Sequence, residues 1–225
     1  MDTPQQHGFT LWELLMTLLV AGILLGIGVP NVMEFQRNGA MTAAANDLVT
    51  GVLMARTEAV KRQAPVAVCL SDNPTDPNPI CLPNAVADSA TRGFIVWVDE
   101  NNNVDVNGAR ILTDATDGNA AVDAGELVLM QSAARGGSIR VSSNCGYTSF
   151  APTGFTRRAG ALCFPNPFQA VLYCDDRGRR AAAGTLSSAR VVRIDRPGRG
   201  QVLQETGDVN GTITGVLAGI APTCP

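Results

Sequence analysis

Few residues of this chain have a type and spacing suited to covalent chemistry. The 225 residues include a single histidine, His7. With only this imidazole, close to the start of the chain, Ser/His/Asp and Cys/His nucleophile arrangements and histidine-ligated metal sites are excluded. No glycine-rich phosphate loop precedes a helix, so a nucleotide site is not indicated. We therefore expect a protein without enzymatic activity and without a cofactor.

An acidic stretch beginning at Asp99 has oxygen-bearing side chains at the alternate spacing of a calcium loop. Counted from Asp99 as position one, however, Val104 stands where an EF-hand needs glycine, and Arg110 stands where it needs a bidentate glutamate. The stretch fails the template, and we expect a solvated hairpin tip rather than a metal site. Further acidic residues follow without a spacing that dictates a cage or an acid/base pair: Asp114, Asp117, Asp123 and Glu126.

Charge is distributed unevenly along the chain. Residues 72–126 hold ten acidic residues and two arginines, a net of −8, whereas residues 135–199 hold eleven arginines and three acidic residues, a net of +8. Arginine suits bidentate contacts with phosphate, so the basic part could bind DNA. The alternative is that it pairs with the acidic insertion or with a neighbouring subunit. The candidate contact residues are Arg177, Arg179, Arg180, Arg190, Arg193, Arg196 and Arg199.

Six widely spaced cysteines without a CxxC pair favour disulfides formed in an oxidising compartment. They are Cys69, Cys81, Cys145, Cys163, Cys174 and Cys224. Six cysteines allow fifteen pairings, and the sequence does not choose among them. Pairing of nearest neighbours would join the first to the second, the third to the fourth and the fifth to the sixth.

The elements that position these residues begin with an apolar run. Residues 9–29 are almost wholly apolar and would form a helix about 31 Å long, enough to cross the hydrocarbon core of a bilayer. A cleaved secretory signal would have a shorter apolar core and a basic start, which residues 1–8 lack. The run contains one charge, Glu13, and a carboxylate in lipid requires a partner. An ordinary signal-anchor helix with an incidental glutamate is the alternative.

The segment GFTLWEL, residues 8–14, resembles the processing motif of type IV pilins and type II secretion pseudopilins. This resemblance implies that prepilin peptidase cuts between Gly8 and Phe9 and methylates the new amino terminus of Phe9. Glu13 would then pair with the ammonium group of a neighbouring subunit when the helices stack with a stagger. Pro30 stands where this class has a helix-kinking proline. The leader departs from the class because it contains Asp2 and no basic residue.

Beyond the membrane span, residues 30–63 are expected to continue the helix. Leu48, Val52, Ala55 and Ala59 recur at helical spacing and form a narrow stripe suited to packing on a sheet. Three basic residues can face solvent: Arg56, Lys61 and Arg62. We expect Pro65 to stop the helix.

Three further segments resemble the GspH/FimT family of minor pilins and pseudopilins: residues 52–69, residues 92–102 and CDDRG at residues 174–178. Some FimT-type members bind DNA through a GRxR motif near this end of the chain. Here GRGQ at residues 198–201 and GRRA at residues 178–181 each match it only in part. The resemblance implies a non-enzymatic subunit, with DNA binding in natural transformation as the alternative.

The remainder, residues 64–225, is predicted to be a periplasmic β-rich head. Short β-type runs at residues 65–70, 94–98, 125–130, 138–142, 169–174 and 189–194 are separated by turn residues. Residues 71–91 and 99–124 read as polar insertions, and prolines make a strand in the first insertion unexpected. The fold class is therefore α+β, a long N-terminal helix packed on an antiparallel sheet or small sandwich.

Together these features predict a structural minor pilin or pseudopilin of a type IV pilus or a type II secretion system. Residues 1–8 are the leader, residues 9–29 span the inner membrane once, and the head lies in the periplasm or in an extracellular pilus. The implied partners are other pilins or pseudopilins, prepilin peptidase, an inner-membrane assembly platform and the lipid bilayer. The sequence does not distinguish the two machines, nor the tip of a filament from its shaft.

Overall fold

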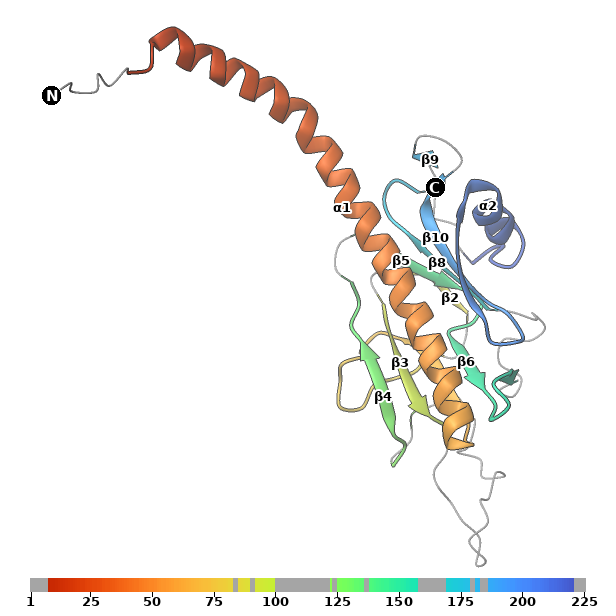
Figure 1. Ribbon diagram of the computed structural model, residues 1–225. Helices are drawn as coiled ribbons and strands as arrows, with labels where there is room; N and C mark the ends of the chain where they lie inside the picture. Colours follow the sequence, from red (N-terminus) through yellow and green to blue (C-terminus); the bar gives the residue numbers. More distant parts are fainter. Residues whose placement is uncertain are drawn as a thin grey trace, which may run out of the picture. The chain divides into compact units, whose positions relative to one another are not determined.

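The computed structural model describes residues 8–82, 85–89, 92–99, 122, 125–135, 138–157, 169–178, 181–182 and 186–220. The chain divides into two compact units, Met1–Ala40 and Met41–Pro225. One long helix, α1 (Leu11–Arg62), begins in the first unit and ends in the second (Figure 1). The expected continuation of the helix beyond residue 29 is confirmed, and Pro30 lies inside it.

The part of α1 in the second unit buries one stripe against the head. The predicted stripe residues Leu48, Val52, Ala55 and Ala59 are all buried. Small side chains let sheet residues approach the helix closely, and the ring of Phe94 lies directly against Gly51. The helix ends at Arg62, and Gln63 follows with a positive φ of 54°, a left-handed conformation typical of helix ends.

The last turn of α1 carries a small charge cluster. Glu58 pairs with Arg62 at 2.6 Å and with Lys61 at 3.2 Å. These two cations lower the pKa of Glu58. Lys61 and Arg62 also suit the negative end of the helix dipole. Both are exposed, as predicted, whereas Arg56 is half-buried.

Two antiparallel sheets form the head. The first has the order β4-β3-β1-β6-β7 and the second has the order β11-β10-β8-β5-β2, with β9 also paired to β10. The first sheet comprises β4 (Val128–Ser132), β3 (Gly93–Val98), β1 (Val66–Ser71), β6 (Tyr147–Phe150) and β7 (Thr156–Arg157). The second comprises β11 (Gly200–Glu205), β10 (Leu186–Ile194), β9 (Ala181–Ala182), β8 (Gln169–Cys174), β5 (Arg140–Ser143) and β2 (Val86–Ser89).

Both sheets contact α1, so the predicted α+β arrangement of a helix on antiparallel sheet structure is confirmed. In the first sheet, Phe94 of β3 meets the helix at Gly51, and Figure 1 shows α1 lying over β3 and β6. In the second, Arg190 of β10 reaches Thr42 of the helix, and Gly200 at the start of β11 lies beside Val49. The second sheet is covered by a short helix, α2 (Thr206–Thr214), which packs on β10 and β11.

Several elements differ from the sequence prediction. Strand β2 lies inside the first polar insertion, where no strand was expected, because it begins after the prolines end. Strands β6 and β11 and helix α2 were not predicted at all. Strand β4 begins at Val128 rather than at Gly125, whose φ of 99° interrupts extended structure.

Candidate assembly site

The start of α1 is set by a side-chain cap. The Thr10 hydroxyl oxygen accepts a hydrogen bond from the backbone N–H of Glu13 at 3.3 Å, and the Thr10 carbonyl accepts one from Leu14 at 3.2 Å. This is one half of a capping box, in which threonine precedes glutamate by three residues. Glu13 therefore lies in the first turn, where a negative charge suits the helix dipole.

The residues expected to be processed lie next to this cap. Gly8 and Phe9 precede the helix and are exposed, and the Phe9 side chain is 85% accessible. A side chain at Gly8 would meet nothing within 4 Å. Glu13 is exposed as well. The geometry therefore leaves both sides of the Gly8–Phe9 bond accessible.

A continuous apolar surface follows along the helix. Large apolar side chains more than 45% exposed recur from Leu11 to Phe35, and they point to all sides of the helix. The helix is long and apolar enough to cross a membrane: an 18-residue stretch near its start has a mean hydropathy of 2.1, and none of that stretch is buried. An apolar cylinder of this kind needs lipid or neighbouring helices around it.

Two features of this segment bear on helix packing. Side chains added at Gly22 or Gly26 would meet nothing within 4 Å, so this GxxxG pair presents an open backbone face. Pro30 cannot donate the hydrogen bond that Gly26 would otherwise accept. The Asn31 side-chain amide donates a hydrogen bond to the carbonyl of Ile27 at 3.2 Å, which adds a polar contact next to Pro30 in the helix.

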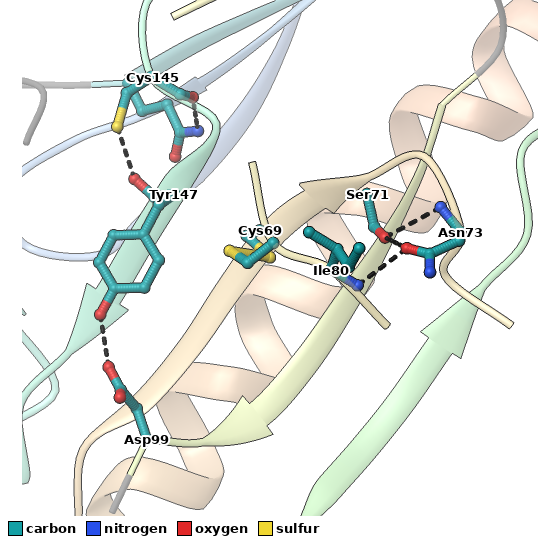
Figure 2. The surroundings of a disulfide bond; sticks show 9 residues. Cys69, Ser71, Asn73, Ile80, Asp99, Cys145 and Tyr147 are labelled. Carbon is teal, nitrogen blue, oxygen red and sulfur yellow. Dashed lines mark hydrogen bonds between the residues drawn. A yellow bond between two sulfur atoms is a disulfide. The ribbon is translucent and has the colours of Figure 1, made fainter. Parts of the chain in front are cut away.

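One predicted disulfide is confirmed. Cys69 of β1 is bonded to Cys81, with a Cα–Cα distance of 5.7 Å. The bond lies in a buried cluster on one face of the first sheet with Trp97 and Tyr147. Figure 2 shows the disulfide and Tyr147. Cys145 is in a disulfide as well. Cys163 lies outside the described residues, so the pairing of Cys145 with Cys163 stays a prediction. Cys174 has a buried thiol rather than a disulfide, so the predicted bond to Cys224 is not found.

Asp99 does not lie at a solvated hairpin tip. It is buried directly after β3, and its carboxylate accepts a 2.6 Å hydrogen bond from the Tyr147 hydroxyl (Figure 2). Its backbone N–H donates to the carbonyl of Pro65 at 3.0 Å. Residues 100–121 lie outside the described part of the chain, so the calcium question is untested there. Within the described part, no cluster of three or more candidate metal ligands occurs.

The arginines do not form one exposed surface. Arg190 is only 4% exposed, so it differs from the solvent-facing role that the sequence suggested. Its guanidinium donates to the carbonyls of Ser187, Ser188 and Ala189 at 2.7 to 3.2 Å, and to the Thr42 hydroxyl at 3.4 Å. Burial lowers the pKa of Arg190, and the nearby Arg177 lowers it further.

The CDDRG segment forms the turn that ends β8. Asp175 is buried, and its carboxylate accepts from both the backbone N–H and the guanidinium of Arg177, the shortest contact being 2.6 Å. Gly178 completes the turn with a φ of 65° and donates to the carbonyl of Asp175. This motif therefore shapes a turn and neutralises a buried carboxylate.

The remaining arginines differ in exposure. Arg193 is 37% exposed and lies 3.3 Å from a carboxylate oxygen of Asp195. Arg196 and Arg199 are exposed on the turn between β10 and β11. Arg179 and Arg180 lie outside the described residues.

Comparison with known proteins identifies the family. Residues 44–198 match the family model described as Type II transport protein GspH. The chain belongs to the GspH family. The match covers most of the head and the helix beneath it, and the expected GspH/FimT membership is confirmed. The amino-terminal processing motif lies outside the matched residues.

Individual relatives are more distant. The chain is 32% identical over 98 residues to the pilin-like protein PilA1 of Thermus thermophilus, which covers 44% of this chain and 51% of the relative. The chain thus spans about half the length of this curated relative. Two crystal forms of the type IV minor pilin FimU of Pseudomonas aeruginosa also match, with 16% and 14% identity and TM-scores of 0.40 and 0.38. These cover 75% and 72% of this chain and 92% and 91% of FimU.

Proposed function

We propose that this GspH-family chain is a structural minor pilin or pseudopilin. It is cut after Gly8 by prepilin peptidase, methylated at Phe9 and anchored in the inner membrane by residues 9–29, with the head in the periplasm. An assembly platform then moves it into a filament with other pilins or pseudopilins. Its role is to pack against neighbouring subunits and to keep them aligned in the filament, and no step requires a cofactor.

The observation that carries this proposal is the exposed apolar surface from Leu11 to Phe35, preceded directly by Gly8 and Phe9. In lipid this surface anchors the chain. In a filament the same surface packs against the equivalent segments of neighbours, so one segment serves both states. Close packing is aided by the open backbone at Gly22 and Gly26.

In this proposal, Glu13 fixes the position of each subunit relative to its neighbours along the filament. A carboxylate in a low-dielectric surrounding attracts a cation far more strongly than it does in water. Cleavage creates an ammonium group at Phe9, four residues before Glu13. The ammonium group of one subunit can then pair with the Glu13 carboxylate of its neighbour. Breaking such a pair leaves a desolvated charge and is costly.

The first test is the natural amino terminus. Mass spectrometry of the membrane-extracted protein should find a chain that starts at N-methylated Phe9. A chain that retains Met1, or that starts unmodified at another residue, would contradict the proposed processing.

The second test is incorporation. Glu13→Val should leave membrane insertion and cleavage intact but reduce recovery of the chain in sheared filaments or in the tip complex, because the ammonium partner is lost. Thr17→Val is a matched control, since it makes a polar side chain apolar one turn further along the same helix. Its hydroxyl donates to the Leu14 carbonyl within the same helix. Equal incorporation of both variants would refute the role of Glu13.

The DNA-binding alternative has less support. Among the candidate arginines, Arg190 is buried and Arg177 is paired with Asp175. In the described part of the chain, only Arg196 and Arg199 are exposed. Neutralisation of many phosphates would require more free cations on one surface. DNA binding by this chain therefore stays a prediction from the sequence.

A further inference from the structure

Three large apolar side chains are exposed on one side of the head, close to two exposed arginines. Leu53 and Val60 of α1 are 46% and 45% exposed, and Phe155, between β6 and β7, is 58% exposed. The arginines are Arg196 and Arg199 on the turn between β10 and β11. We call these five residues the Phe155 surface.

The helix and the β6–β7 turn are in direct contact within this surface. Leu53 and Val60 are seven residues apart and so share a helix face. Arg56 lies between them and donates from its Nε to the carbonyl of Gly154 at 3.1 Å. A Cβ at Gly154 would lie 3.3 Å from Cγ2 of Val60. Phe155, the next residue, therefore extends the apolar face of the helix.

The β10–β11 turn packs onto the same place. A Cβ at Gly198 would lie 2.8 Å from the carbonyl oxygen of Gly154, and Gly198 has a φ of 76°. The backbone N–H and the hydroxyl of Thr156 both donate to the carbonyl of Arg196 at 3.0 Å. Arg196 is thus fixed beside Phe155 through its backbone carbonyl. Arg199 belongs to the same turn, where its carbonyl accepts a hydrogen bond from the backbone N–H of Asp195, and both arginine side chains are exposed.

The two guanidinium groups have no ion-pair partner among the described residues. By contrast Arg177, Arg92 and Arg135 each pair with a carboxylate. Apolar side chains next to unneutralised cations complement a surface that is apolar at its centre and acidic at its rim.

We propose that the Phe155 surface docks a neighbouring pilin or pseudopilin subunit through apolar side chains flanked by aspartate or glutamate. This inference rests on the proposed function and specifies which part of the head makes the contact. A protein partner is favoured over nucleic acid because two aliphatic side chains, Leu53 and Val60, gain by burial against apolar groups, whereas phosphate offers them none. Two free cations also neutralise few phosphates.

The test uses the full chain in cells that assemble the filament. A photo-crosslinking residue, p-benzoyl-phenylalanine, replaces Phe155, and in a matched control it replaces Ile80, which is 64% exposed but lies outside the surface. We expect a discrete crosslinked product at position 155 only, whose second component is identified by mass spectrometry as another pilin-like subunit.

Charge reversal makes the test specific. Arg196→Glu with Arg199→Glu should lower the yield of this product about tenfold or more, since like charges across an interface repel each other. Lysine at both positions should largely retain it. Reversal of an acidic residue at the crosslinked site of the partner should restore the yield of the glutamate variant.

Other outcomes would overturn the proposal. These are equal yields at positions 155 and 80, a product that contains nucleic acid or lipid in place of protein, or a yield that charge reversal leaves unchanged. The same preparations are analysed for the Phe9 terminus and for recovery with filaments. A processed, incorporated chain without the crosslink refutes this surface and leaves the proposed function standing, whereas an unprocessed, unincorporated chain refutes both.

Discussion

The guanidinium of Arg190 is satisfied mainly by backbone carbonyls of its own strand and links β10 to the helix through Thr42. Buried charged groups are stabilising only where their hydrogen bonds are complete. Arg190 thus acts as a structural residue at the junction of α1 with the second sheet. Asp175 beside it is likewise neutralised by Arg177 rather than left for an external partner.

We expect Arg190→Met to lower the free energy of unfolding by about 2 to 3 kcal/mol, because several carbonyls lose a charged donor inside the protein. Arg196→Met, which changes an exposed arginine, should shift the free energy of unfolding by no more than about 0.5 kcal/mol. Denaturation of the full chain in detergent can be followed by the fluorescence of Trp97, which is fully buried. Similar stabilities for the two variants would show that Arg190 is dispensable.

The sequence carries a signal for this burial. Arg190 lies opposite Tyr173 in the register of β10 and β8, and it shares one face of β10 with Val192 and Ile194. An arginine on the face of a run that is otherwise apolar indicates burial. Asp99 had no such signal, because its hydrogen-bond partner Tyr147 is distant in sequence.

Among the elements, the contact between α1 and β3 depends on a glycine. A Cβ at position 51 would overlap the ring of Phe94, which is itself 3% exposed. The close approach of helix and sheet therefore requires the absence of a side chain at this position. Gly39, in the same helix, has no neighbour within 4 Å of the equivalent point.

We expect Gly51→Ala to destabilise the head by about 1 to 3 kcal/mol through overpacking, despite the better helix propensity of alanine. Gly39→Ala should be neutral or stabilising. The double variant Gly51→Ala with Phe94→Leu should recover part of the loss. Thermal unfolding followed by circular dichroism measures all three, and a stabilising Gly51→Ala would contradict the close packing.

Prediction of the elements succeeded where apolar, β-branched runs are buried on both faces, as in β1, β3 and β8. It failed where polar residues form strands through long-range pairing: β6 (YTSF) is defined by its hydrogen bonds to β1. Helix α2 has threonine and glycine at many positions and poor intrinsic propensity. Its buried Val209 and Ile213, which pack on the second sheet, explain why it forms.

At the scale of the whole molecule, the sequence predicted an anchor and a head, and the structure divides at Ala40 into two compact units. The described part of the first unit, residues 8–40, is almost entirely helix with exposed side chains, while the second unit contains both sheets and the core. The amino-terminal motif was readable because it is local. The pairing of strands into sheets and the Phe155 surface could not be read from the sequence, because both bring together segments that are far apart in the chain.

A chain lacking residues 1–36 should therefore be monomeric in water and unfold cooperatively. This truncation removes the exposed apolar residues through Phe35 and keeps one helical turn before the buried Met41. Sedimentation velocity and circular dichroism measure the two properties. The full chain, which retains the apolar surface, should require detergent, and aggregation of the truncated chain would contradict the independence of the head.

The Thr10 cap has a consequence for maturation. A cut after Gly8 would remove only residues that precede the cap, so the hydroxyl-to-amide bond that starts α1 would survive on the mature side. Proteolysis and helix formation would then be uncoupled, because the helix start would be the same before and after the cut. A peptidase that cut there could act on a finished helix at any time after insertion, without waiting for the chain to refold.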